Sequence, residues 1–159
     1  MTKTARTPAA CIEAEREALG RLTELLRDEQ RALVTGDLEK LASYADPKAK
    51  LLFELSRCAD ERAHLLRTHG YAADAAGMDN LLRKLGDDTA AVVSDWQRLL
   101  DDSKLARQLN ETNGTLIAAR MRGTQQALGV LLRAARIPGT YAADGTTVGL
   151  HRTNRLAVV

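Results

Sequence analysis

The chain has 159 residues, and its composition favours helices. It contains 26 alanines and 25 leucines against seven valines and three isoleucines, and only five residues are aromatic. Sandwiches, barrels and parallel sheets draw on β-branched and aromatic residues, so this composition disfavours them. Charged residues make up 28% of the chain with a net charge of +2, a balance that argues against nucleic-acid binding. We therefore expect an all-α fold, an elongated antiparallel helical bundle or coiled-coil hairpin.

The charges separate a body from two ends. Residues 1–12 and 136–159 each carry a net charge of +2, and residues 13–135 carry −2. Cys11 and Cys58 lie in Ala/Leu-rich helical patterns, where a thiol packs as a small hydrophobic group, and this favours a reducing compartment. No apolar run approaches the ~18 residues of a membrane span. These features predict a protein of a reducing compartment without direct membrane insertion.

The first expected helix covers about residues 8–35. Thr7 followed by Pro8 is typical of a capped helix start, and Gly36 followed by Asp37 is typical of a stop and a new cap. Between these signals, apolar residues recur every seven positions, at Ile12, Leu19, Leu26 and Leu33.

The second expected helix covers about residues 37–68 and contains a proline. Pro47 removes one helical hydrogen bond and crowds the preceding turn. Two outcomes follow from the sequence: a kink at Pro47, or a fresh helix start capped by Asp46. Residues 70–79 are rich in Ala, Gly and Asp and are expected to form a loop, with a short helix over Asn80–Leu85.

The third expected helix is the longest, about residues 87–135, and completes a single helical domain over residues 1–135. One seam through it advances by threes and fours, a coiled-coil spacing, but several of its residues are small or polar. Such a seam is either a close packing surface or a groove that awaits another helix. Its members are Leu99, Ser103, Ala106, Leu109, Asn113, Leu116, Arg120, Gly123, Ala127, Val130 and Ala134.

Residues 136–159 change in character. This segment has Pro138, glycines and threonines, and no helical period, so we expect a flexible tail. Tyr141 has no local helix to pack into; it belongs either to a plain linker or to a short recognition motif. Trp96, in contrast, lies among apolar residues and is expected in the core, with a partner contact as the alternative.

No reaction chemistry is predicted. Glu61 and His64 have the spacing of one half of a di-iron site, but the chain has no second Glu-x-x-His. The acidic pairs at 87–88 and 101–102 point about 100° apart on a helix and cannot converge on one atom. We therefore predict no catalytic residue, no metal site and no cofactor.

Parts of the long helix and the tail resemble one family. The helix residues that carry the resemblance are 95–97, 109–114, 116–117 and 125–128, and the tail residues are 141–145, Tyr-Ala-Ala-Asp-Gly. These segments resemble the FlgN family of flagellar export chaperones, whose tail motif has the form Tyr-Gly-Ala-Asp-Gly. The resemblance is specific over residues 95–150 and only architectural over residues 1–94.

The resemblance implies a cytoplasmic type III secretion chaperone. Such a protein binds the hook–filament junction proteins FlgK and FlgL, prevents their premature assembly and delivers them to the cytoplasmic domain of the export-gate protein FlhA. It implies gate binding by Tyr141, with Asp144 and Gly145 beside it. It implies client binding by Asn113, Leu116, Ile117, Arg120, Ala127, Leu128 and Leu131.

A second hypothesis comes from another class of protein. The chain could be a structural coiled-coil protein that oligomerises through the same seam and has no secretion client. A chaperone with an empty client groove can also pair with a second copy, so self-association alone does not separate the two.

Overall fold

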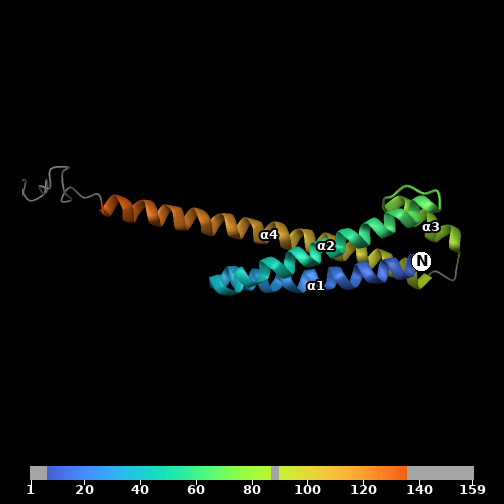
Figure 1. Cartoon of the computed structure of the whole chain (residues 1–159), viewed down its shortest axis with the longest axis horizontal. Coiled ribbons are helices and arrows are strands. Elements are labelled where there is room, and N and C mark those ends of the chain that lie inside the picture. The colour runs from blue at the N-terminus through green and yellow to red at the C-terminus, as the bar shows by residue number, and fades with distance from the viewer. Residues whose placement is uncertain (1–6, 87–89, 136–159) are drawn as a thin grey trace, which may run out of the picture. The chain divides into compact units, whose positions relative to one another are not determined.

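The structure is a computed structural model that describes residues 7–86 and 90–135 (Figure 1). It confirms the all-α fold with a long C-terminal helix. The helices are α1 (Pro8–Thr35), α2 (Leu38–Thr68), α3 (Ala75–Leu85) and α4 (Ala90–Ala135). No strand occurs in the described ranges. The predicted tail, residues 136–159, lies outside the described residues.

Packing divides the chain into two units, residues 1–116 and residues 117–159. The boundary lies inside α4, immediately after Leu116. The single domain predicted over residues 1–135 stays a prediction. Each unit is described below by itself.

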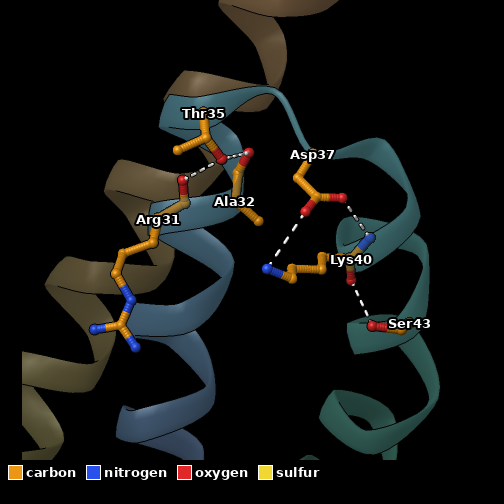
Figure 2. Close-up of polar contacts among 6 residues, drawn as sticks. All are labelled: Arg31, Ala32, Thr35, Asp37, Lys40 and Ser43. Carbon is orange, nitrogen blue, oxygen red and sulfur yellow. Dashed lines mark hydrogen bonds and ion pairs between the residues drawn. The ribbon is translucent and has the colours of Figure 1, made fainter.

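Local capping groups fix the turn between α1 and α2. Gly36 has a left-handed backbone, with φ of 79°, and its N–H donates to the Ala32 carbonyl at 2.8 Å. Asp37 then begins α2, because its carboxylate accepts from the Lys40 N–H at 3.0 Å (Figure 2). The backbone bond to Lys40 is the main reason why the pKa of Asp37 is lowered. The predicted stop and cap are confirmed, and α1 and α2 form an antiparallel hairpin.

α2 passes through Pro47 without a break. Of the two outcomes left open by the sequence, a fresh start capped by Asp46 does not occur. α2 is stabilised along its length by packing on α1, and tertiary packing of this kind can outweigh the local cost of an internal proline.

α3 begins five residues earlier than the sequence analysis expects. The Asp74 carboxylate accepts from the Gly77 N–H at 2.7 Å and caps the helix, which runs from Ala75. Gly77 makes this start possible, since a Cβ there would lie 1.9 Å from the Ala72 carbonyl oxygen. The predicted loop over residues 70–79 is therefore too long, and the helix expected over Asn80–Leu85 is the second half of α3.

The core of the first unit combines residues from all four helices. Trp96 is 2% exposed and belongs to it, as predicted. The Trp96 Nε1–H donates to the Asp79 carboxylate at 2.9 Å, and the Arg62 guanidinium lies 5.3 Å from its ring centroid. Cys11 and Cys58 are both buried in the first unit, as expected for small hydrophobic groups. The core members are Cys11, Ile12, Leu19, Leu22, Leu26, Leu65, Leu66, Met78, Leu81, Leu82, Trp96, Leu99 and Ala106.

Candidate partner-binding site on α4

Every second residue of the α4 seam is buried in the first unit, and the last of these buried residues is polar. Leu99, Ala106 and Asn113 are 2%, 5% and 0% exposed. These positions follow one another at intervals of seven, the period that the sequence predicts. This part of the seam is thus a packing surface within the chain.

Asn113 joins α4 directly to α1 and, through Glu29, to α2. Its Nδ2 donates to the Leu26 carbonyl of α1 at 2.8 Å and to the Glu29 carboxylate at 2.7 Å. The same carboxylate accepts from the Lys48 ammonium of α2 at 3.0 and 2.9 Å. The Asn113 Oδ1 is buried and has no hydrogen-bond partner among the described residues. This polar cluster, Glu29, Lys48 and Asn113, fixes where α4 lies along the hairpin.

This geometry bears on the expected client contacts of the first unit. Asn113 has no exposed surface, so in the described conformation its amide contacts α1 and not solvent. Leu116 is half-buried. A client could reach the Asn113 amide only after it leaves the Leu26 carbonyl and the Glu29 carboxylate.

The second unit carries a row of exposed apolar side chains on its helical segment, residues 117–135. Each of its members lies three, four or seven residues from another member, so they share one side of the helix. Their exposed fractions range from 39% at Ile117 to 65% at Leu131. We call this set the α4 stripe; it consists of Ile117, Met121, Leu128, Leu131 and Leu132.

The sequence predicts part of the α4 stripe and misses the rest. Ile117, Leu128 and Leu131 belong to the predicted client-binding set and are exposed. Met121 and Leu132 were not expected there, although the spacing from Ile117 to Met121 and from Leu128 to Leu132 is four residues in each case. The predicted set, which follows from the family resemblance, also contains Ala127, one position before Leu128.

The charges of this segment have one sign. Residues 117–135 contain three arginines and no aspartate or glutamate. Arg120 and Ala127, both in the predicted set, are exposed. The segment therefore presents large apolar groups in a positive field.

The gate-binding residues lie outside the described part of the chain. Tyr141, Asp144 and Gly145 fall in residues 136–159, so their roles stay predictions.

The Glu61–His64 pair is described, and there the Glu61 carboxylate accepts from Arg57 at 2.7 Å. Within residues 7–86 and 90–135, no three His, Cys, Asp or Glu side chains gather closely enough to hold a metal ion.

Comparison with known proteins identifies the family. The sequence matches the FlgN protein family over residues 1–149. The chain belongs to the FlgN family. This membership covers both the hairpin and the long helix, whereas the resemblance in the sequence analysis is specific only from residue 95 onward.

Curated relatives of this FlgN-family chain come from Salmonella. The flagella synthesis protein FlgN of Salmonella typhimurium strain LT2 is 34% identical over 100 residues, which cover 62% of this chain and 69% of the relative. The flagella synthesis protein FlgN of Salmonella typhi matches to the same extent. No solved structure matches the chain. None of the described helices combines the length and apolar character needed to cross a membrane.

Proposed function

We propose that this chain is a cytoplasmic flagellar export chaperone for the junction proteins FlgK and FlgL. Membership of the FlgN family and the Salmonella relatives' name, flagella synthesis protein, support this assignment. The observation that carries it is the α4 stripe, a helical row of large apolar side chains that stay exposed in the free chain. The role is one of binding and involves no reaction.

The proposed capture step is helix-in-groove binding. A client's terminal helix lays its apolar side on the α4 stripe, and burial of apolar surface supplies about 25 cal/mol per Å². While the helix is held there, it cannot assemble with its own neighbours. Arg120 and Ala127 border the stripe and are the proposed secondary contacts.

Delivery requires a second contact. Tyr141, with Asp144 and Gly145, is proposed to bind the cytoplasmic domain of the export-gate protein FlhA. Separate sites for client and gate allow one chaperone to hold both at once. Tyr141→Ala should therefore weaken gate binding measured by calorimetry and leave client capture unchanged; unchanged gate affinity would remove Tyr141 from the site.

The capture step is tested by Leu128→Asp. Leu128 is 55% exposed, so the substitution removes no buried packing, and circular dichroism should show an unchanged helix content. Co-purification with the C-terminal segments of FlgK and FlgL should drop at least about tenfold, because a buried charge opposes the apolar contact. The control is Gln126→Asp, which adds the same charge on the opposite side of the segment.

The outcome also separates the two hypotheses of the sequence analysis. If the wild-type chain captures neither segment, the chaperone proposal fails and a structural coiled-coil role is favoured. If Leu128→Asp and Gln126→Asp capture equally well, the chaperone role stands but the α4 stripe is not its client site.

A further inference from the structure

α2 has an apolar row that the bundle does not cover. The row advances by four, three, four and three residues from Leu38 to Leu52, so it lies on one side of the helix. Leu38 is 71% exposed and Leu52 is 50% exposed, and Phe53 beside it is 75% exposed. We call this set the α2 stripe; it consists of Leu38, Ala42, Ala45, Ala49, Leu52 and Phe53, all exposed.

The α2 stripe is distinct from the side of α2 that packs in the bundle. Leu51 and Leu55 are half-buried against the core, and Cys58, Leu65 and Leu66 are buried. The core is thus complete without the α2 stripe. An apolar row left over in this way marks an interaction surface.

The alanines of the α2 stripe suit a helix as the partner. Three of its central positions are Ala42, Ala45 and Ala49. Small side chains let two helix backbones approach closely. The alternating spacing of three and four residues is the spacing that knobs-into-holes packing uses. No charged residue interrupts the row.

The charges beside the α2 stripe are self-complementary. Along one flank, Glu39 and Asp46 precede Lys50 and Arg57, and all four are exposed. Positions 46 and 50 lie symmetrically about residue 48, and so do positions 39 and 57. In an antiparallel pair related by a two-fold axis at residue 48, each acid of one copy faces a base of the other.

Helix geometry makes this match specific to one arrangement. In an antiparallel helix pair the same flank of each helix faces its counterpart, whereas in a parallel pair opposite flanks meet. The four charges share one flank, so only the antiparallel arrangement joins them. Arg57 also pairs with Glu61 in its own helix, and the match therefore depends mainly on Asp46 and Lys50.

We propose that the α2 stripe binds a second copy of this chain, antiparallel, in a two-fold dimer. With the two-fold axis at residue 48, residues 43–53 of the two copies face one another, a length of about 15 Å at 1.5 Å per residue. A single helix pair of that length lies at the small end of specific interfaces, so we expect a dissociation constant of about micromolar. The dimer forms and dissociates at ordinary protein concentrations.

Sedimentation velocity of the full chain tests the dimer. Between about 1 and 200 µM the wild type should shift from monomer to dimer. Ala49→Arg places a charge at the centre of the row and should weaken the dimer at least about tenfold. Ala119→Arg, the same substitution at an exposed alanine of α4, is the control and should leave the dimer unchanged.

A charge exchange tests the antiparallel register. Asp46→Lys and Lys50→Asp each place like charges opposite one another and should each weaken the dimer. Mixed together, the two variants should form a heterodimer, because every facing pair then has opposite signs. Within each variant chain residues 46 and 50 carry like charges, so only contacts between copies can restore association.

Three results would overturn the proposal. The first is a wild type that stays monomeric up to about 200 µM. The second is a dimer that survives Ala49→Arg and is lost in Leu128→Asp, which would place the contact on the α4 stripe. The third is a monomeric wild type in which Ala49→Arg impairs capture of the FlgK or FlgL segments, because the α2 stripe would then take the client.

Discussion

The buried amide of Asn113 offers a sharp test of how α4 is held on the hairpin. Asn113→Ala removes the hydrogen bonds to the Leu26 carbonyl and to the Glu29 carboxylate, both between helices. The Lys48 ammonium remains bound to Glu29, so the carboxylate keeps a partner. The substitution therefore isolates the contribution of the amide.

The expected cost follows from five contributions. The bond to the neutral carbonyl contributes about 1 kcal/mol and the bond to the carboxylate about 2. Lost packing around a fully buried side chain adds about 1 kcal/mol. Against this, removal of the unpartnered Oδ1 recovers about 1 kcal/mol, and alanine is a better helix former by about 0.6. The free energy of unfolding should fall by about 2 kcal/mol.

Thermal and urea unfolding followed by circular dichroism measure this change. For a chain of this size, 2 kcal/mol corresponds to a melting temperature lower by about 4–8 °C. Asn110→Ala is the matched control, because Asn110 is exposed on the same helix and gains only the helix propensity of alanine. If Asn113→Ala is as stable as Asn110→Ala, the polar cluster does not hold α4 and the reasoning is wrong.

The remaining predictions concern the first unit. Gly77→Ala should lower the free energy of unfolding by at least about 2 kcal/mol, because the new Cβ would overlap a backbone carbonyl. Gly114→Ala, whose new Cβ would meet open space, should raise the free energy of unfolding by about 1 kcal/mol. Urea titration measures both changes. Burial raises the pKa of Cys58, so the unfolded thiol ionises first and stability should fall from pH 8 to 10; Cys58→Ala should show a smaller fall. Trp96→Phe leaves Asp79 without its indole donor and should cost about 1–3 kcal/mol by thermal unfolding.

Helix ends with local signals could be predicted from the sequence. The Thr7 hydroxyl accepts from the Ala10 N–H, and Gly36 adopts the left-handed backbone that a helix stop favours. Each of these contacts joins residues at most four positions apart. The sequence alone contains such information, so the bounds of α1 and the start of α2 followed from it.

The start of α3 depends on a contact that composition does not reveal. Alanine, glycine and aspartate at residues 70–79 favour a loop on average. The structure uses Asp74 as a cap and brings the Gly77 backbone against Ala72, which only glycine permits. The same residues thus begin a helix, and the prediction from composition was wrong by five residues.

The polar seam position could not be interpreted from α4 alone. Asn113 in a heptad row suits either a buried partner or an open groove. Glu29 and Lys48, which decide between them, come from 84 and 65 positions earlier in the chain. The sequence fixes the period of α4, but the position of the hairpin relative to that period is a tertiary property.

The two exposed rows differ in ways that favour different partners. The α2 stripe is built on alanines and has acids and bases on one flank, so it suits a close, self-complementary helix pair. The α4 stripe carries large side chains, and its segment has arginines without acids. Two copies of the α4 stripe would bring arginines together, which opposes self-pairing through that surface. Self-association and client capture are therefore expected to use separate rows, so that each can be removed by one substitution without loss of the other.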